Sequence, residues 1–442
     1  MGSFLIRNTD MASAPVVFNA DQQKAREMFH KFMQSEDINE MGLVGPPGRG
    51  KSWLVNQLIL ELRSQTKIMN HLLDENNQLN LALTATSNES ANLIGESCGE
   101  RASTIHSLLG LRLIDNYETG EQDLIKTQHY AYKYGTLVIV DEAGWVNLAL
   151  LNITRQTLHD CKILYVYDHK QLTAVNKKDG STSTCAVHEC VDYTAYLSIN
   201  ERNDNPIGII GDRFRDSVGE DYFPHLQEYP GWVEFIDDDK FRELIKKHFV
   251  DETHDAKILA WTNHMVNAYN EYVRDEIYDY VEYLPGEVVV TNKPIPSPCG
   301  SFNLYATDAK INITAHGEQT TIDGVDGYEV YDDRQNLIFV PYDMALVNRM
   351  INQAYIAKNW TDYFRYKKNF HDLRPLYAST VHKVQGKTND ITIVDLDDIG
   401  CNPNPEEVKR LLGVAFSRPR NKLYLYGSLP RKYGGTDNAR RI

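Results

Sequence analysis

The stretch Gly45-Pro-Pro-Gly-Arg-Gly-Lys51-Ser52 has the spacing G-x-x-x-x-G-K-S of a phosphate-binding loop. Glycines at Gly45, Gly48 and Gly50 let backbone N–H groups turn toward phosphate oxygens at the start of a helix. Lys51 can then reach the terminal phosphates, and the Ser52 hydroxyl can ligate Mg²⁺. An apolar run precedes the loop and a helical pattern follows it, so the stretch predicts a nucleoside triphosphate site rather than an ordinary Gly-Pro turn.

Two adjacent carboxylates, Asp141 and Glu142, follow the apolar run of the stretch LVIVDEA. An Asp at the end of a buried strand can hold the magnesium ion, and the Glu beside it can polarise the attacking water. The alternative is a solvated acidic pair at a strand end. The apolar run and the phosphate loop in the same predicted sheet favour the catalytic interpretation, so the sequence predicts an NTPase.

A parallel sheet with helices on both faces is expected to position these groups. Apolar residues recur at helical spacing over 21–34 and 52–65, whereas 42–44, 81–87, 135–143 and 162–168 are short apolar runs typical of buried strands. This alternation predicts a doubly wound α/β domain.

The rest of the chain departs from this pattern twice. Residues 110–127 place two short segments around a Glu-Thr-Gly-Glu turn, which predicts a hairpin projecting from the sheet. A second α/β region begins near residue 196, with a strand at 256–263 and a helix at 264–278. Short β segments with many turn residues between about 285 and 375 predict a small inserted β-barrel. The α/β pattern resumes at 378–398 and closes at 422–429.

Composition limits the class of protein. The 442 residues are 42% hydrophobic and 24% charged, without a long apolar run or signal peptide, which predicts a globular cytoplasmic protein that does not bind membranes. Six scattered cysteines fit a reducing compartment. Cys185, His188 and Cys190 could form a metal site, although the irregular spacing favours plain thiols. The net charge of −15 argues against coating nucleic acid by bulk electrostatics but allows a basic groove.

A series of stretches resembles, in order, the motifs of the superfamily 1 helicases of the 5′-to-3′, RecD-like branch, and most closely its Dda group. They are FNADQQKA, the phosphate loop, TATSNESANLIG, ASTIHSLLG, VDEA, YDHKQLTAV, NERNDNPI, AWTNHMVNAYN, NWTDYFRYKKNF, ASTVHKVQGKT and GVAFSRPR. Three positions depart from the family pattern: Gly144 stands in place of Ser, Tyr167 in place of Gly, and Ala174 in place of Pro. These departures bear on the coupling between nucleotide and strand, not on the nucleotide chemistry.

The resemblance implies two RecA-like motor domains, at 1–109 with 128–195 and at 196–285 with 376–442. It further implies a wedge hairpin at 110–127 and an SH3-like β domain at 286–375. The expected activity is ATP- and Mg²⁺-dependent 5′-to-3′ unwinding of DNA, in phage replication or recombination. The expected partners are single-stranded DNA, a duplex fork and a single-strand-binding protein, and the chain is expected to act as a monomer.

The resemblance also assigns roles to residues. Gln22 would contact adenine, Gln171 beside Asp168 would sense the γ-phosphate, and Arg202 and Arg418 would stabilise the transition state as arginine fingers. Polar and cationic groups at strand ends would contact the nucleic-acid backbone without reading bases. They are Thr86, Thr104, His106, Thr380, His382 and Lys383, with Gln385 in the same motif as the last three. Trp360 and Phe364 are the aromatic candidates for stacking on bases.

Two other functions remain open. One is a single-strand translocase that displaces proteins without unwinding duplexes. The other is an ATPase switch that needs no nucleic acid, which would leave the later motifs without a reason to be present.

Overall fold

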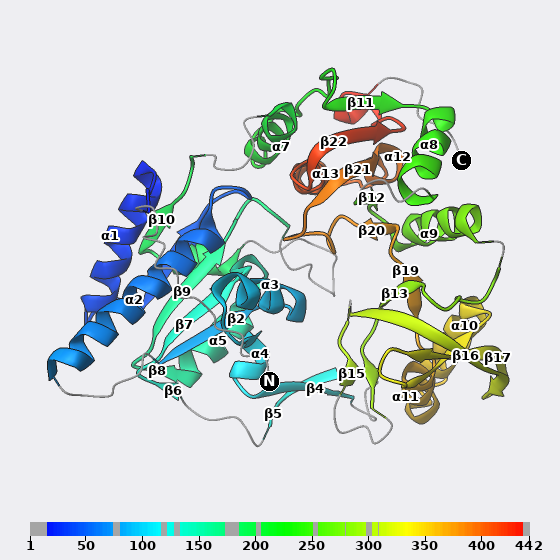
Figure 1. Cartoon of the computed structure of the whole chain (residues 1–442), viewed down its shortest axis with the longest axis horizontal. Helices are drawn as coiled ribbons and strands as arrows, with labels where there is room; N and C mark the ends of the chain where they lie inside the picture. The colour runs from blue at the N-terminus through cyan, green and yellow to red at the C-terminus, as the bar shows by residue number, and fades with distance from the viewer. Residues whose placement is uncertain are drawn as a thin grey trace, which may run out of the picture.

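The computed structural model describes residues 16–73, 80–115, 122–127, 133–172, 185–199, 205–250, 255–278, 280–297, 303–307 and 309–435. Two parallel sheets and one antiparallel sheet organise these residues. In Figure 1 the first parallel sheet lies among the blue and cyan elements, the second among the green and orange ones, and the antiparallel sheet among the yellow ones. The two parallel sheets agree with the predicted α/β class.

The first sheet has the order β10-β1-β9-β7-β2-β3, and all its strands are parallel. Its strands are β1 (Glu40–Val44), β2 (Leu81–Ala85), β3 (Ala102–Thr104), β7 (Leu137–Asp141), β9 (Lys162–Tyr167) and β10 (Thr194–Tyr196). Its helices are α1 (Ala20–Gln34), α2 (Lys51–Leu73), α3 (Asn88–Cys98), α4 (Ile105–Leu108), α5 (Leu148–Thr157) and α6 (Ala186–Cys190). The helix, strand and loop order predicted around the phosphate loop is confirmed.

Helices cover both faces of this sheet, which explains why its strands are apolar throughout. Phe29 and Phe32 of α1 and Leu54 of α2 pack with Leu43 of β1 on one face. On the other face, Val138 and Val140 of β7 pack with residues of α5 and α6. A capping box between Asn19 and Gln22 fixes the start of α1.

The second sheet has the order β11-β22-β21-β12-β20 and is also parallel. Its strands are β11 (Val233–Ile236), β12 (Ala256–Ala260), β20 (Ala378–Thr380), β21 (Asn389–Asp395) and β22 (Pro419–Tyr426). Its helices are α7 (Pro206–Asp216), α8 (Asp238–Ile245), α9 (Asn263–Ile277), α12 (Leu396–Gly400) and α13 (Pro405–Phe416), with a π-helical turn at Lys246–Val250 and a 3₁₀ helix at Arg431–Tyr433. The strand and helix expected after residue 256 are therefore confirmed.

The antiparallel sheet has the order β18-β17-β16-β13-β19, so its last strand comes from the far end of the inserted segment. Its strands are β13 (Val288–Thr291), β16 (Lys310–Ile322), β17 (Val325–Asp332), β18 (Leu337–Pro341) and β19 (Leu373–Pro375), beside a small pair β14 (Ile295–Pro296) and β15 (Asn303–Tyr305). Its core includes Val289, Ile311 and Val330.

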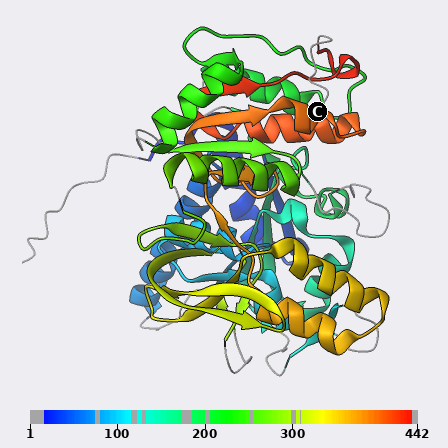
Figure 2. The same ribbon diagram turned by 90° about the vertical axis from the view of Figure 1, so that its right-hand side faces the viewer.

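Two helices in this segment were not predicted from the sequence. They are α10 (Met344–Ile356) and α11 (Trp360–Asn369), and Figure 2 shows them in gold beside the yellow strands. Asp343 and Asn359 cap their first turns, and Val347 and Phe370 help to bury them against the sheet. The many turn residues elsewhere in the segment had suggested β structure alone.

A hairpin leaves the first sheet after α4. Strands β4 (Leu111–Asp115) and β5 (Gln122–Lys126) pair antiparallel, with Leu111 opposite Lys126. The Thr127 amide and hydroxyl both donate to the Gly110 carbonyl, at 2.8 and 2.9 Å, and so close the base of the hairpin. The predicted Glu-Thr-Gly-Glu turn lies outside the described residues. A separate two-residue pair joins β6 (Lys133–Tyr134) to β8 (Leu158–His159).

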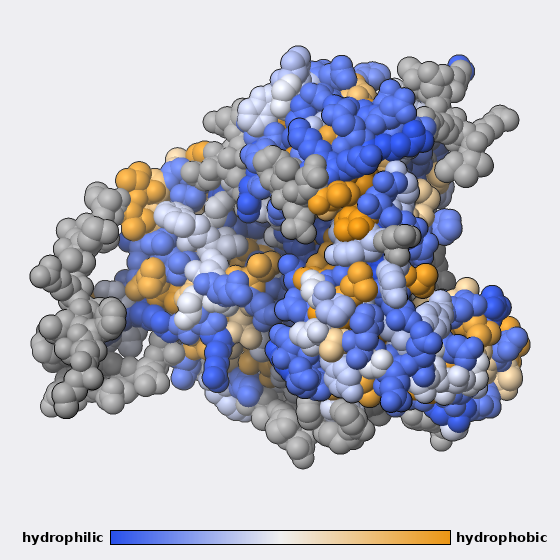
Figure 3. All heavy atoms as spheres, turned by 45° about the vertical axis from the view of Figure 1, so that its right-hand side comes forward, coloured by the Kyte–Doolittle hydropathy of each residue, from blue (hydrophilic) through white to orange (hydrophobic). Residues whose placement is uncertain are grey.

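The face drawn in Figure 3 is largely hydrophilic, and its hydrophobic residues form small separate patches. Within the described residues, no helix combines the length and hydropathy needed to cross a bilayer.

Candidate nucleotide and nucleic-acid sites

The phosphate loop joins the carboxyl end of β1 to the amino end of α2. Gly48 and Gly50 have φ angles of 77° and 78°, in the left-handed region that favours glycine. A Cβ on Gly45 would lie 2.7 Å from the Leu197 carbonyl oxygen, so the first glycine allows close packing against the strand β10 region. Backbone amides at the start of the long helix α2 are thereby directed toward the position of an anion.

Lys51 begins α2, and its ammonium donates to the carbonyls of Gly45 and Pro46 at 2.7 and 3.0 Å. Burial lowers the pKa of Lys51, and the carboxylates of Asp168, Glu142 and Asp141 oppose that shift. The cation therefore sits among three carboxylates at the loop, where it can bind an anionic ligand.

A cleft of about 510 Å³ lies in front of this loop. Its lining includes Gly48, Gly50, Lys51 and Ser52 from the loop, Asp141 and Glu142 at the end of β7, Asp168 and Gln171 after β9, Gly386 between β20 and β21, and Arg418 just before β22. Residues predicted from separate stretches thus meet in one cavity between the two parallel sheets. Gln22 and Gly45 are not among the described lining residues; the Gln22 side chain accepts from the Asn19 amide at 3.1 Å.

Asp141 and Glu142 end β7 with different backbone conformations. Glu142 has φ 51° and ψ 37°, which places it in the left-handed region. Burial, together with the neighbouring Glu142 carboxylate, raises the pKa of Asp141 to about 7. A divalent cation would compensate this concentration of negative charge, so the Asp141 carboxylate and the Ser52 hydroxyl fit a magnesium site.

Asp168 is held by α7, a helix of the second sheet. Its carboxylate accepts hydrogen bonds from Arg215 of α7, from Nε at 3.0 Å and from Nη2 at 2.9 Å. Burial raises the pKa of Asp168, but the Arg215 guanidinium outweighs it and leaves that pKa below its usual value. Arg410 of α13 also contacts the segment after β9: its guanidinium donates to the carbonyls of His169 and Gln171 at 3.1 and 2.7 Å. Sequence reasoning missed Arg215 and Arg410, because no spacing marks either one.

Arg418, a predicted arginine finger, lines the cleft, and its guanidinium group is hydrogen-bonded to neighbouring residues around the second sheet. Its guanidinium donates to the carbonyls of Val414, Val384 and Lys387 at 3.0, 3.4 and 3.0 Å, and to the Ser417 hydroxyl at 2.6 Å. It therefore braces the loop 381–388 against the cleft. Arg202, the second predicted finger, lies outside the described residues.

Within the described residues, two contacts join the loop 381–388 to elements of the first sheet. The Gln385 amide donates to the Glu142 carboxylate at 3.3 Å, and Lys387 pairs with Glu89 of α3 at 2.6 Å. Gln385 belonged to a recognised motif, but nothing in the sequence indicated that it would meet Glu142.

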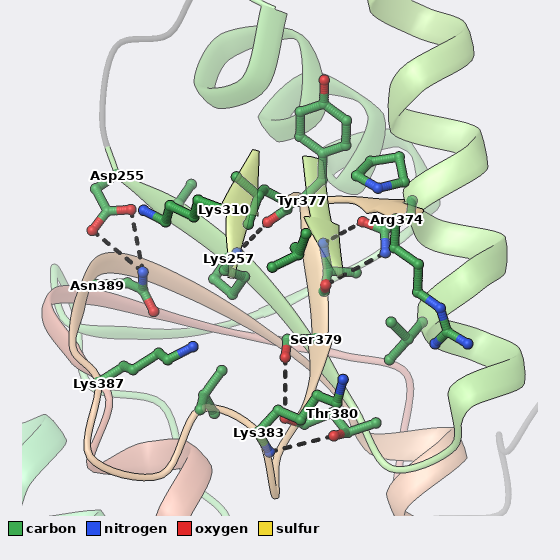
Figure 4. A pocket seen from close by; sticks show the side chains of 18 of the residues that line it. Asp255, Lys257, Lys310, Arg374, Tyr377, Ser379, Thr380, Lys383, Lys387 and Asn389 are labelled. Atoms are coloured by element: carbon green, nitrogen blue, oxygen red, sulfur yellow. Dashed lines mark hydrogen bonds between the residues drawn. The ribbon is translucent and has the colours of Figure 1, made fainter. Parts of the chain in front are cut away.

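The candidate nucleic-acid contacts follow the edges of both parallel sheets. Thr86 follows β2 and donates to the Glu142 carbonyl at 3.3 Å, and Thr104 ends the edge strand β3 and caps α4, which contains His106. Thr380 ends β20, the edge strand of the second sheet. Thr380 and Lys383 line the pocket in Figure 4, whereas His382 is half-buried 4.0 Å from Glu407.

The prediction that Phe364 stacks on bases is wrong. Its side chain is 1% exposed and is packed inside the segment that carries α11, so neither ring face is available to a base. Trp360 is partly exposed and meets Tyr355 and Tyr363 edge to face, at centroid distances of 5.6 and 5.9 Å.

Two of the three departures from the family pattern are accommodated by packing. Tyr167 is buried beside Gly42, where a Cβ on the glycine would lie 3.2 Å from the tyrosine hydroxyl. A Cβ on Gly144 would meet the Asp168 carbonyl oxygen at 3.5 Å, an ordinary contact distance. Ala174 lies outside the described residues.

The alternative metal site at Cys185, His188 and Cys190 finds no support in the described part of the chain, where no group of three such side chains could hold a metal ion. His188 instead stacks on His169, with ring centroids 4.1 Å apart.

Comparison with known proteins bears on the whole chain. The family model of an AAA domain matches residues 18–205. The chain is 23% identical over 439 residues to the "ATP-dependent DNA helicase dda" of Enterobacteria phage T4, covering 88% of this chain and 94% of that protein. Among solved structures, it is similar to Pif1 helicase from Bacteroides in complex with ADP-AlF3 and ssDNA, with 14% identity, 92% of each chain covered and a TM-score of 0.45. It is also similar to Pif1 helicase from Candida albicans, with 14% identity, 95% and 96% of the two chains covered and a TM-score of 0.43. The sequence similarity supports the resemblance inferred from the motifs: over 88% of its length the chain is similar to a DNA helicase named dda, and residues 18–205 match the model of an AAA domain.

Proposed function

We propose that this protein is an ATP-dependent 5′-to-3′ DNA helicase that moves along single-stranded DNA and unwinds a duplex fork. One observation carries the proposal. The nucleotide cleft and a basic pocket beside Thr380 and Lys383 share wall residues, because Leu93 and Gly386 line both. The two cavities therefore share part of one wall, an arrangement that suits a motor in which hydrolysis is coupled to strand movement.

In the proposed mechanism, Lys51, Ser52 and Asp141 would hold Mg·ATP at the phosphate loop. The magnesium ion would supply charge that offsets the phosphates and helps to orient them. Glu142 orients the water and takes its proton, and Gln171 senses the terminal phosphate. Arg202 and Arg418 provide positive charge from the second domain. The cross-domain contacts of Arg215 and Gln385 would then be remade as the cleft opens and closes.

The proposed domain division follows the sheets. The segments 1–109 with 128–195 and 196–285 with 376–442 would be two RecA-like motors, and 286–375 would be an SH3-like β domain that braces the hairpin 110–127. The strand orders of the two parallel sheets and the antiparallel pairing of β13 and β16–β19 support this division.

A DNA-stimulated ATPase assay tests the function. Hydrolysis is expected to rise severalfold on adding single-stranded oligonucleotide, and a forked duplex with a 5′ tail is expected to be unwound. A rate of ATP hydrolysis that does not change when DNA is added would indicate the nucleic-acid-independent switch. Stimulation and protein displacement without unwinding would indicate the single-strand translocase.

The hairpin provides a sharper prediction. Replacing residues 112–125 with a short Gly-Ser turn keeps the buried Leu111 and the closing bonds between Gly110 and Thr127. We expect this variant to keep DNA-stimulated hydrolysis and single-strand translocation but to lose unwinding. Each base-pair step costs about 1.4 kcal/mol of stacking to open, and a motor without a wedge must wait for fraying.

Stopped-flow unwinding and translocation are to be measured on the same variant. An equal loss of both activities would mean that the hairpin supports the fold. Loss of neither would place the wedge elsewhere in the molecule.

A further inference from the structure

A basic pocket of about 750 Å³ lies where the second sheet, the antiparallel sheet and α3 come together. Figure 4 shows lysines from different elements around this pocket: Lys257 comes from β12, Lys310 from β16 and Lys387 from the loop 381–388. The positively charged lining residues are Lys257, Lys310, Arg374, Lys383, Lys387 and Arg420. The carboxylates in the lining are Glu89 and Asp255. In a chain of net charge −15, this excess of cations marks a site for an anion.

Several of these charges are already engaged within the protein. Arg374 pairs with Asp372 at 2.9 Å, Lys387 pairs with Glu89 at 2.6 Å, and the Asn389 amide donates to Asp255 at 3.2 Å. Both carboxylates of the pocket are thus occupied by other groups.

Lys257 and Lys310 differ from these paired residues in having no carboxylate partner among the described residues. The Lys257 ammonium donates to the backbone carbonyl of Leu376, and within the described ranges no carboxylate lies within ion-pair distance of Lys257 or Lys310. Burial, and then the neighbouring Lys387 and Lys310, lower the pKa of Lys257 to about 8, although the carboxylates of Asp255 and Glu89 oppose the shift. A half-buried lysine beside two other lysines, with no carboxylate paired to it in the described part of the chain, gains from an anion that enters the pocket, because the anion offsets both the burial and the repulsion.

We propose that this pocket binds the phosphodiester backbone of single-stranded DNA, with Lys257 and Lys310 as phosphate ligands. When no strand is bound, the Glu89 carboxylate occupies the position beside Lys387 that a phosphate would take. The proposal rests on the proposed function and extends it to two lysines outside the recognised motifs. The size of the pocket and its cations from three elements suit a polyanion, and Thr380 and Lys383 extend it toward the end of β20.

The role of Glu89 follows from its position. It lies in the first turn of α3, and its partner Lys387 belongs to the loop that also touches Glu142. A strand phosphate and the Glu89 carboxylate compete for the same ammonium group. Strand binding therefore separates one of the two contacts that tie the loop 381–388 to the first domain.

Equilibrium binding without nucleotide tests this inference, with a fluorescein-labelled oligothymidylate followed by anisotropy over a range of salt concentrations. Lys310→Ala and Lys257→Met are each expected to weaken binding about 3- to 10-fold near 0.1 M salt, and to reduce the slope of log K against log[salt] by about 0.7 per lost phosphate contact. Lys310 is exposed, so its variant tests the pocket without disturbing a buried group. Lys240→Ala, on the exposed surface of α8, is the matched control and is expected to bind as the wild type does.

Glu89→Gln distinguishes a phosphate site from a general effect of charge removal on folding. It is expected to tighten binding about two- to fivefold, opposite in sign to the lysine variants, because a competitor and a repulsive charge are both removed. Weaker binding by Glu89→Gln would overturn its role as competitor. Wild-type affinity and salt slope in both lysine variants would overturn the pocket while leaving the helicase proposal standing, whereas a wild type that binds no oligonucleotide would overturn the proposed function itself.

Discussion

Lys51→Ala is expected to lower ATP hydrolysis by roughly 10²-fold or more, with or without DNA, because a preorganised cation at the transferred phosphate contributes on that scale. In the cleft, Lys51 is the cation nearest the loop carbonyls of Gly45 and Pro46 and faces Asp141, Glu142 and Asp168. Arg418 lines the same cleft but is bound to carbonyls of its own domain, so it does not substitute for the ammonium group.

The measurement is steady-state hydrolysis with saturating oligonucleotide, and Lys67→Ala on the exposed side of the same helix is the matched control. Turnover by Lys51→Ala within about threefold of the wild type would remove the phosphate-loop assignment. A thermal melt of each variant separates lost chemistry from lost fold.

Glu142→Gln is expected to retain nucleotide and single-strand binding while losing about 10²- to 10⁴-fold in turnover, the range for removing a positioned general base. The amide has the shape of the carboxylate but cannot take a proton. Since Glu142 raises the pKa of Asp141, the substitution is also expected to lower that pKa and leave Asp141 better ionised. Any loss of metal binding would then have another cause.

Titration with a fluorescent ATP analogue measures the nucleotide affinity of this variant, and the hydrolysis assay measures its turnover. If nucleotide affinity falls as far as turnover does, Glu142 is a ligand of the nucleotide complex and not a base. Gln385→Ala is a useful companion, because it removes a side-chain amide that donates to the Glu142 carboxylate while leaving the carboxylate in place.

The sequence predicted those parts of the site that depend on local pattern. One apolar strand ends just before Gly45 and another ends at Asp141, so a parallel sheet brings these residues to one edge, and β1 and β7 are separated there only by β9. The glycines of the phosphate loop were predictable for the same reason, because their backbone conformation is local.

Contacts between distant segments could not be predicted in this way. Arg215 meets Asp168 because α7 of the second domain lies against the end of β9, and neither residue type nor spacing reveals that packing. Phe364 was misjudged for a related reason: an aromatic residue near a motif is as suited to a core as to a base, and only the tertiary structure shows which it is. The helices α10 and α11 carry local capping signals at Asp343 and Asn359, but the surrounding turn residues outweighed them.

The left-handed backbone of Glu142 has a consequence for the energetics of folding. A residue with a Cβ in that region stores roughly 1–2 kcal/mol of conformational strain, and glycine would store almost none. Domains of this kind are stable by about 5–15 kcal/mol in total, so this one residue gives up an appreciable part of that margin. Four other non-glycine residues also have a positive φ, namely Asp160, Asp323, Gln335 and Lys358, but of the five only Glu142 lines the nucleotide cleft. There, the backbone geometry that presents a carboxylate to the cleft also lowers the stability of the fold.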